Sequence, residues 1–305
     1  MSEVRLGYFS PSPVLPRVIT ALAADGILLH AERVASSLAQ FAALAAGEYD
    51  VVVTSPDNVL AYRFAARLGQ PLDLRILLGI DRGLGLSLLA RPEIRDPSQL
   101  IGRRVAVDVT HSGFALAMFG LLATAGIRRD EFDVVELGAT PRRRSALLAG
   151  ECDATMLNAG QDILAEEAGC NRLMRVVDRF EPYLGSVLAT TTSWLDAHRG
   201  LARQLAAAWT EALRRTTDPR YRSETIDLIT AEMGLSPTAA NLFYRTLVND
   251  REGLIPDGRI DTDAWATVLR LRLQYGSGAS MGAETESATV LAAVTDREFP
   301  PNPTS

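Results

Sequence analysis

Four short polar turns hold most of the side chains in this sequence that could bind a small molecule. The turns are Phe-Ser-Pro-Ser-Pro at 9–13, Thr-Ser-Pro-Asp-Asn at 54–58, Val-Thr-His-Ser-Gly-Phe at 109–114 and Leu-Asn-Ala-Gly-Gln-Asp at 157–162. Each follows an apolar run and precedes a helical pattern, so hydroxyls, amides and the free N–H groups of a helix start would lie together. Such groups bind polar or anionic molecules. The candidate ligand contacts are Ser10, Ser12, Ser55, Asp57, Asn58, Thr110, His111, Ser112, Gly113, Asn158 and Gln161.

The same residue types have a plainer explanation, because Ser, Thr, Asp and Asn are the common N-caps of helices. One such turn would therefore say little about function. All four turns, however, would lie at the carboxyl ends of strands, which is where open parallel sheets bind their ligands. The coincidence predicts a binding site that several turns build together.

The turn at 109–114 is the most informative of the four. Thr110 and Ser112 supply hydroxyls, and Gly113 lets a ligand approach the backbone at a helix start, which suits an anionic group. His111 is either a proton-transfer group or a partly exposed histidine that assists the helix cap. In the turn at 9–13, prolines fix φ and lack N–H groups, so they would hold that loop open.

The basic residues narrow the possible chemistry. All 31 of them are arginine. Without lysine there is no Schiff base to pyridoxal phosphate and no lysine of a phosphate-binding P-loop. The net charge of −6 argues against a nucleic-acid partner, because that affinity comes mainly from basic side chains. One alternative for the arginine run at 142–144 is phosphate binding, but three adjacent arginines at a helix start are typical of a solvated helix face, which is our interpretation.

No metal site or cofactor site is indicated. The two cysteines, Cys152 and Cys170, are too few for a disulfide framework and lack the spacing of a zinc site. The histidines, His30, His111 and His198, lie far apart in the sequence. We therefore expect neither a metal ion nor a cofactor.

The order of sequence patterns predicts an α/β fold. Apolar strand-like runs alternate with helical patterns up to about residue 190, which favours mainly parallel sheets flanked by helices. From about 194 to 275 the pattern is helical throughout, with N-cap signals at Ser236 and Asp261. The end of the chain lacks a strong helix or strand signal.

Three stretches resemble a known family. They are Gly-Glu-Tyr-Asp-Val-Val-Val-Thr-Ser-Pro-Asp-Asn at 47–58, Leu-Ile-Gly-Arg-Arg-Val-Ala-Val-Asp-Val-Thr-His-Ser-Gly at 100–113 and Ala-Leu-Leu-Ala-Gly-Glu-Cys-Asp-Ala-Thr-Met-Leu-Asn at 146–158. Together with the order of elements over residues 4–275, they resemble the type II periplasmic binding-protein-like family. Within it the resemblance is to the nitrate, sulfonate and taurine substrate-binding group, which also contains thiamine-pyrimidine-synthase-like proteins.

The resemblance implies two lobes with the ligand in the cleft between them. Lobe one would hold residues 1–83 and 192–280, and lobe two residues 92–183. Segments 84–91 and 184–191 would cross between the lobes, and 281–305 would be a partly flexible tail. Closure would be a hinge motion, and Tyr183 would be either an aromatic wall of the cleft or part of the packing between the lobes.

The resemblance implies a small-molecule-binding protein similar to the substrate-binding proteins of sulfonate and nitrate ABC transporters. The alternative is a cytosolic lyase, hydrolase or isomerase, desulfinase-like, on the same scaffold, with His111 as acid-base group and Ser10, Ser12 or Asp57 assisting. The catalytic lysine and cysteine-rich motif of the thiamine-pyrimidine synthases are absent from this sequence, and the first turn lacks the cysteine of the desulfinases. A sensor domain is a third possibility.

The first residues of the sequence bear on the location of the protein, and the location bears on its possible partners. The first residues carry no basic segment followed by an apolar one, so no secretory signal is predicted, and no apolar run is long enough to span a membrane. We expect a cytoplasmic protein, exported only if a signal precedes the sequence. The expected partner is a polar or anionic small molecule, and an ABC permease would be a partner only of an exported form.

Overall fold

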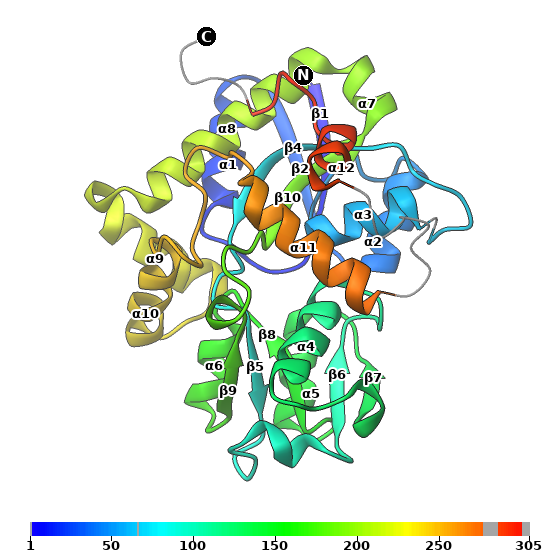
Figure 1. Cartoon of the computed structure of the whole chain (residues 1–305). Coiled ribbons are helices and arrows are strands. Elements are labelled where there is room, and N and C mark those ends of the chain that lie inside the picture. Colours follow the sequence, from blue (N-terminus) through cyan, green and yellow to red (C-terminus); the bar gives the residue numbers. More distant parts are fainter. Residues whose placement is uncertain (1, 66, 277–285, 301–305) are drawn as a thin grey trace.

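Two lobes, each built on a five-stranded sheet, make up the protein (Figure 1). The computed structural model describes residues 2–65, 67–276 and 286–300. The α/β class and the two-lobed architecture predicted from the sequence are confirmed. Among the described residues, none of the helices has both the length and the apolar composition needed to cross a bilayer.

The sheet of the first lobe has the strand order β2-β1-β3-β10-β4. Its strands are β1 (Ser2–Tyr8), β2 (Ile27–Arg33), β3 (Val51–Thr54), β4 (Leu74–Asp81) and β10 (Ser186–Thr191). Strand β1 pairs in parallel with β2 and β3, whereas β10 runs antiparallel to both β3 and β4. The sheet is therefore mixed, with one reversed strand that arrives late in the chain.

The sheet of the second lobe repeats this plan, with the order β7-β6-β8-β5-β9. Its strands are β5 (Ser87–Ala90), β6 (Arg104–Val107), β7 (Asp133–Glu136), β8 (Ala154–Leu157) and β9 (Asn171–Arg175). Strand β6 is parallel to β7 and β8, and β5 is antiparallel to β8 and β9. The segments expected to cross between the lobes, 84–91 and 184–191, thus contain the reversed strands β5 and β10.

Helices follow most of the parallel strands and cover both sheets. The α-helices are α1 (Leu15–Ala24), α2 (Ser37–Ala45), α3 (Pro56–Phe64), α4 (Gly113–Thr124), α5 (Thr140–Leu148), α6 (Gln161–Glu167), α7 (Thr192–Ala197), α8 (Arg199–Thr217), α9 (Arg222–Met233), α10 (Pro237–Leu247), α11 (Thr262–Tyr275) and α12 (Ser287–Val294). Short 3₁₀ helices occupy Pro97–Leu100, Arg129–Glu131, Val176–Asp178 and Pro219–Tyr221. The side chains of Ser236 and Asp261 cap α10 and α11, as the sequence predicted.

Two edge strands and one helix were not indicated by the sequence pattern. Strands β2 and β9 contain polar residues and no residue of β9 is fully buried, so neither has the continuous apolar run of an inner strand. Residues 281–285 and 301–305 of the predicted flexible tail lie outside the described residues. Between them, α12 buries Val290 and Val294 and so belongs to the packed structure.

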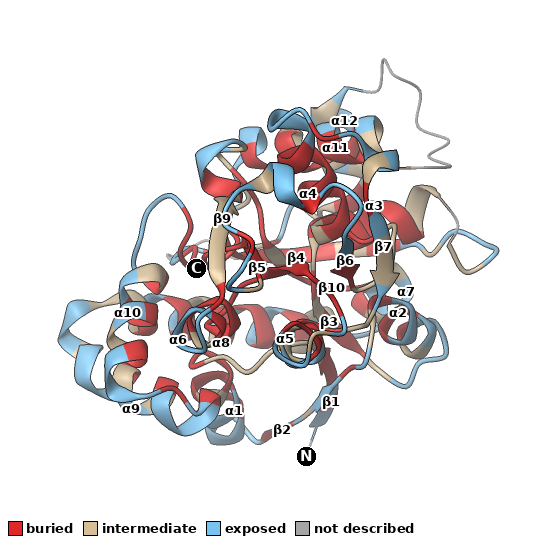
Figure 2. Cartoon of the chain, turned by 90° about the horizontal axis from the view of Figure 1, so that it is seen from below, coloured by how far each residue is buried: buried red, intermediate tan, exposed pale blue. Residues whose placement is uncertain are grey.

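Helix α11 joins the two lobes. It packs against α3 of the first lobe and against α4 of the second, and Figure 2 shows buried residues of all three helices on the same side of the molecule. The approach of α11 to α4 is close, because a Cβ atom at Gly120 would lie 2.9 Å from Leu271 Cδ2. One hydrophobic cluster therefore includes residues of both lobes, such as Trp265 of α11 and Met118 of α4.

A buried ion pair lies within this junction. The Arg272 guanidinium of α11 donates to the Asp57 carboxylate of α3, with Nη2 2.6 Å from Oδ2, and the two side chains are 0% and 2% exposed. The same Nη2 donates to the backbone carbonyl of His111 at 2.9 Å. Arg272 thus connects α11, α3 and the turn at 109–114 through one group.

We predict that replacing Arg272 alone strongly destabilises the protein. In Arg272→Met the Asp57 carboxylate stays buried without its counter-charge, which costs about 3–5 kcal/mol of unfolding free energy. The double variant Arg272→Met/Asp57→Asn should regain part of this loss, because no charge is then left unpaired. Urea unfolding followed by circular dichroism measures both.

The matched control is Arg214→Met, which breaks an exposed pair with Glu211 whose side chains are 54% and 56% exposed. Such a surface pair contributes about 0–1 kcal/mol. If Arg272→Met were no more destabilising than this control, the buried pair would not hold the junction together.

Candidate ligand-binding cleft

A cleft between the lobes receives residues from both sheets. It encloses about 1030 Å³, counting the space at its open mouth. Its walls come from the turn after β1, the ends of β3 and β4, the turns after β6 and β8, and the starts of α4 and α5. The carboxyl ends of parallel strands from both lobes thus face one space, as the sequence analysis expected.

Apolar and aromatic side chains form much of the cleft wall. The larger ones include Leu6, Tyr8, Phe9, Leu15, Ile80, Leu84, Phe114, Trp209 and Leu254. A wall of this kind binds the apolar body of an organic ligand by removing its surface from water. Polar groups interrupt the wall at a few places and so can orient the ligand.

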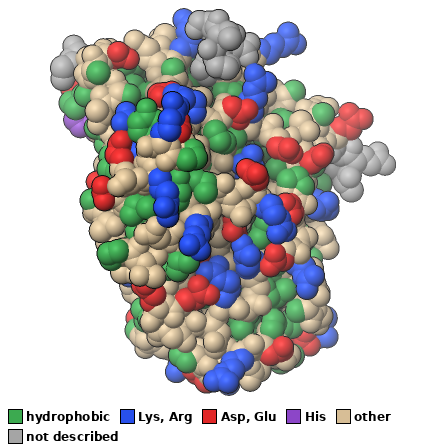
Figure 3. Space-filling model, turned by 90° about the vertical axis from the view of Figure 1, so that its left-hand side faces the viewer, with side chains coloured by type: hydrophobic (Ala, Val, Ile, Leu, Met, Phe, Trp, Pro, Cys, Tyr) green, Lys and Arg blue, Asp and Glu red, His purple; other side chains and the backbone are tan. Residues whose placement is uncertain are grey.

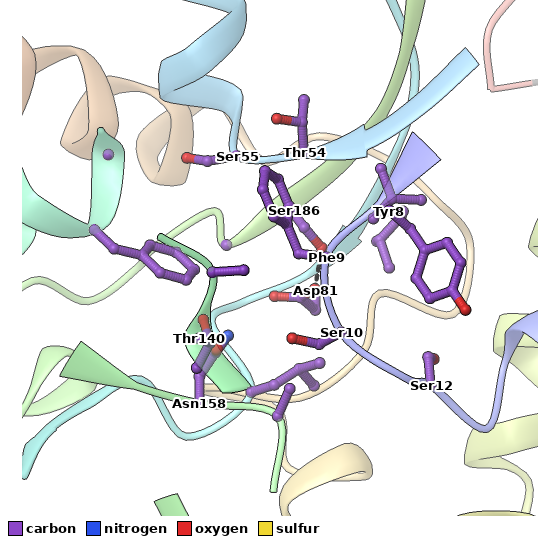
Figure 4. A pocket seen from close by; sticks show the side chains of 18 of the residues that line it. Tyr8, Phe9, Ser10, Ser12, Thr54, Ser55, Asp81, Thr140, Asn158 and Ser186 are labelled. Atoms are coloured by element: carbon purple, nitrogen blue, oxygen red, sulfur yellow. Dashed lines mark hydrogen bonds between the residues drawn. The ribbon is translucent and has the colours of Figure 1, made fainter. Parts of the chain in front are cut away.

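In the first lobe, Ser10, Ser12, Ser55 and Asn58 line the cleft. The Oγ atoms of Ser12 and Ser55 accept from nearby backbone N–H groups, at 3.2 Å and 3.3 Å. These hydroxyls therefore act as caps, yet their O–H groups can still donate to a ligand. In Figure 4, Ser10 lies beside Asp81 in the middle of the cleft, whereas Ser12 lies at its margin.

In the second lobe, Ser112, Gly113 and Asn158 line the cleft. Ser112 caps α4 by accepting from Ala115 N at 3.4 Å. Asn158 donates from Nδ2 to the carbonyl of Gly83 at 3.0 Å, which ties the turn after β8 to the crossing segment. The same serine can therefore cap a helix and also line the cleft, so the two explanations of these turns are compatible.

Five other candidate residues do not line the cleft: Asp57, Thr110, His111, Gln161 and Tyr183. Asp57 is held by Arg272, as described above. Tyr183 is only 2% exposed within the hydrophobic core, where burial raises the pKa of its hydroxyl. Gln161 is buried at the start of α6.

Thr110 and His111 lie beside the cleft rather than in its wall. Thr110 donates from N and Oγ1 to Glu136 Oε1, at 2.6 Å and 2.7 Å, and these hydrogen bonds lower the pKa of the Glu136 carboxyl. Burial, followed by the nearby Arg67 and Arg272 charges, lowers the pKa of His111. His111 is therefore mainly neutral at neutral pH.

Three charged groups that the sequence analysis did not single out line the cleft: Asp81, Asp108 and Arg143. Asp81, at the end of β4, is 4% exposed, and burial raises its pKa to about 6. It accepts from Gly83 N at 2.7 Å and from Ser186 Oγ, the bond dashed in Figure 4. Because Gly83 directly precedes the first crossing segment and Ser186 lies in the second, Asp81 fastens the two crossings together beside the cleft.

Arg143 corrects our interpretation of the arginine run as a solvated face. It is 1% exposed, and burial lowers its pKa to about 10. Its guanidinium donates to Thr155 Oγ1, Thr140 Oγ1 and the carbonyls of Gly138 and Met156. The spacing of Thr140 and Arg143 on one face of α5 was the sequence signal that could have revealed this inward side chain.

The two lobes touch along the margin of the cleft. Asp108 Oδ2 of the second lobe accepts from Ser37 N and Oγ of the first, at 3.2 Å and 2.7 Å. Ala139 N donates to the Ala35 carbonyl at 3.1 Å. At Gly113, a Cβ atom would lie 2.6 Å from Ser55 Oγ and 2.7 Å from Asp57 Cβ, so the absence of a side chain permits this contact.

Comparison with known proteins fits this architecture. The model of the NMT1-like family matches residues 1–230, which is more than half of the chain. The chain belongs to the NMT1-like family. A comparison with curated proteins gave no match.

Several solved structures share the fold of this NMT1-like protein. A protein of Bordetella bronchiseptica RB50 is 19% identical, with a TM-score of 0.78 and coverage of 98% of this chain and 95% of that one. The alkanesulfonate-binding protein SsuA from Xanthomonas axonopodis pv. citri, bound to MOPS, is 15% identical, with a TM-score of 0.76 and coverage of 97% and 98%. The periplasmic nitrate-binding protein NrtA from Synechocystis PCC 6803 is 12% identical, with a TM-score of 0.75 and coverage of 97% and 86%. At these identities the likeness shows the fold.

We predict that Gly113→Ala destabilises the protein by about 1–3 kcal/mol, because the new methyl group overpacks a rigid contact. Gly200→Ala is the matched control, since among the described residues no atom beyond its chain neighbours and the adjacent helix backbone lies within 4 Å of a Cβ at that position. In the helix α8 this control should be neutral or stabilising by up to about 1 kcal/mol. Urea unfolding compares the two, and equal stability would show that the lobes do not press together at Gly113.

Proposed function

We propose that this NMT1-like protein binds and releases a small organic molecule in the cleft between its lobes, without transforming it. The observation that carries the proposal is the cleft itself, which combines apolar walls with polar groups from the strand ends of both lobes. A ligand that contacts both lobes at once favours the arrangement in which they touch. Binding and closure are therefore coupled.

The shared fold supports the same conclusion. The Xanthomonas and Synechocystis proteins are named as alkanesulfonate-binding and nitrate-binding. By analogy, we propose that the present protein is a substrate-binding protein of this general kind, for a small polar ligand. Fold alone does not determine the ligand, so its chemistry must be inferred from the groups that line this particular cleft.

The enzyme alternative has less support. Its acid-base candidate, His111, does not line the cleft, and no other histidine does. Ser10 and Ser12 therefore have no histidine base beside them in the cleft wall. Asp81 has a raised pKa, yet each of its oxygens already accepts a hydrogen bond from the crossing segments.

We predict that the purified protein carries or takes up a small molecule that native mass spectrometry detects. Ser10→Trp should abolish the added mass, because the indole ring would occupy the middle of the cleft, while circular dichroism shows a folded protein. His111→Ala should keep the added mass. Conversion of the bound molecule by the wild type, lost in His111→Ala, would instead favour the enzyme.

We also propose that the protein is located in the cytoplasm. An exported form would instead deliver its ligand to an ABC permease. Fractionation of the native cell should recover the full-length protein with the cytoplasmic markers. Recovery in an extracytoplasmic fraction, together with a processed N-terminus, would replace this proposal by the transport role.

A further inference from the structure

We propose that the cleft selects an organic molecule that carries a protonated amino or amidino group, together with a hydrogen-bond acceptor elsewhere on an apolar body. This inference rests on the proposed function and specifies its ligand. It departs from the polar or anionic ligand expected from the sequence. Three features of the cleft wall carry the argument: its charge balance, a carboxylate oxygen without a partner and an indole N–H without a partner.

The charge balance of the cleft wall is negative. Its carboxylate and guanidinium side chains are Arg143, Asp81 and Asp108, one positive and two negative groups, which leaves a net charge of −1 when both carboxyls are ionised. Arg143 makes four hydrogen bonds to protein groups and is 1% exposed. It is therefore built into the protein as a structural group. A free anion in the cleft would lie near two carboxylates and gain no unengaged cation.

The Asp108 carboxylate has one satisfied and one unsatisfied oxygen. Oδ2 accepts from Ser37 N and Oγ across the lobe boundary. Oδ1 is buried and has no hydrogen-bond partner among the described residues. Because buried carboxylate oxygens are almost always paired, a donor from a ligand would satisfy this atom. A ligand ammonium group would supply such a donor and, beside the nearby Arg143, a second positive charge.

The Trp209 indole is the second group without a partner. It lines the cleft from α8 of the first lobe, is 3% exposed, and its Nε1 has no partner among the described residues. An indole N–H only donates, so an acceptor on a ligand would satisfy it. Asp108 follows β6 in the second lobe. A molecule that satisfies both atoms therefore carries its donor and its acceptor at separate positions and contacts both lobes.

The rest of the wall suits the body of such a molecule. Phe9, Phe114 and Leu254 are among the apolar side chains that line the cleft. The serine hydroxyls can donate or accept, so they fit neutral polar atoms of many kinds. Charge, rather than hydroxyl content, then distinguishes a cationic amine from a nitrate or sulfonate ion.

Three probes with the same aromatic body test this selectivity: phenethylamine, phenethyl alcohol and phenylacetate. Nitrate and methanesulfonate are tested separately as two further probes. Equilibrium dialysis at neutral pH measures their affinities. We expect the amine to bind at least about tenfold more tightly than phenylacetate, as one charge-assisted hydrogen bond predicts. Equal or tighter binding of phenylacetate, nitrate or methanesulfonate would overturn the proposal and leave the proposed function intact.

If none of the probes binds, the molecule that co-purifies with the wild type decides, since its charge is read from its identified mass and structure. An amine supports the proposal, and an anion or a neutral molecule without an amino group overturns it. If nothing binds and nothing co-purifies, the proposed function itself fails, and this inference with it.

Substitutions at Asp108 and Trp209 test whether these two side chains contact the ligand. Asp108→Asn should weaken the amine, or the co-purifying molecule, about tenfold, whereas Asp133→Asn, an exposed carboxylate of the same sheet, should change nothing. Ser37→Ala keeps the Asp108 charge and removes a contact between the lobes, so it should weaken all probes equally. A similar loss for amine and alcohol in Asp108→Asn would contradict a direct charge contact.

Trp209→Phe keeps an aromatic ring and removes the N–H group. This substitution should weaken binding of the co-purifying molecule several-fold. Trp265→Phe is the matched control, because Trp265 Nε1 is also buried without a partner among the described residues, but Trp265 lies in the core away from the cleft wall. Equal effects of the two substitutions would show that the Trp209 N–H group does not contact the ligand.

Discussion

The Asp81 carboxylate is the interaction on which the cleft depends most directly. It accepts hydrogen bonds from Gly83 N and Ser186 Oγ, and so joins the chain that leaves the first lobe to the chain that returns. The space around it is minimal, because a methyl group at Gly185 would overlap both Asp81 Oδ1 and Gly83 N. The two crossings can therefore run side by side only with a carboxylate between them and a glycine opposite. The reversed strands β5 and β10 begin close to this point, at Ser87 and Ser186.

This carboxylate is retained against the cost of its burial. Burial raises its pKa to about 6, well above the ordinary value of an aspartate, so the folded protein binds a proton more readily there than the unfolded chain does. Between these two pKa values the native state holds more protons, and the contribution of Asp81 to stability falls as the pH rises through that window. Asp81 is therefore explained by its two hydrogen bonds rather than by favourable ionisation. Arg272 is a second buried charged group that joins distant segments. It connects α3, α11 and the turn at 109–114, and its pair with Asp57 brings opposite charges together away from water.

The fold and part of the site could be predicted from the sequence because their signals are local. Apolar runs, helix caps and polar turns at strand ends indicated the two α/β lobes, and Ser10, Ser55 and Asn158 do line the cleft. What could not be predicted depends on partners far away in the sequence. Asp57 has the type and position of a ligand contact, yet its partner is Arg272, 215 residues later.

The same limit applies to the charged groups of the cleft. Asp81 and Asp108 each follow an apolar strand, and that position was a usable signal for a carboxylate at a sheet edge. For Arg143 the local pattern was misleading, because three adjacent arginines are typical of a solvated face. Only the turn of α5 separates exposed Arg142, paired with Glu151, from buried Arg143.

On the face in Figure 3, basic side chains lie among acidic ones, so that face presents no continuous basic surface.

Fold and ligand chemistry are set by different residues in this protein. The residues that make the fold are the apolar strands, the tight crossing at Gly185 and the junction at α11, and proteins that share little sequence can share all of these features. Ligand chemistry depends on the few side chains at the strand ends that line the cleft. A cleft with two carboxylates and one fully engaged arginine is therefore compatible with the same architecture as a protein named for nitrate or sulfonate. Under the ligand proposal, Asp108 Oδ1 and Trp209 Nε1, which have no partner among the described residues, mark where the ligand would pair, because a buried polar atom is costly unless something pairs with it.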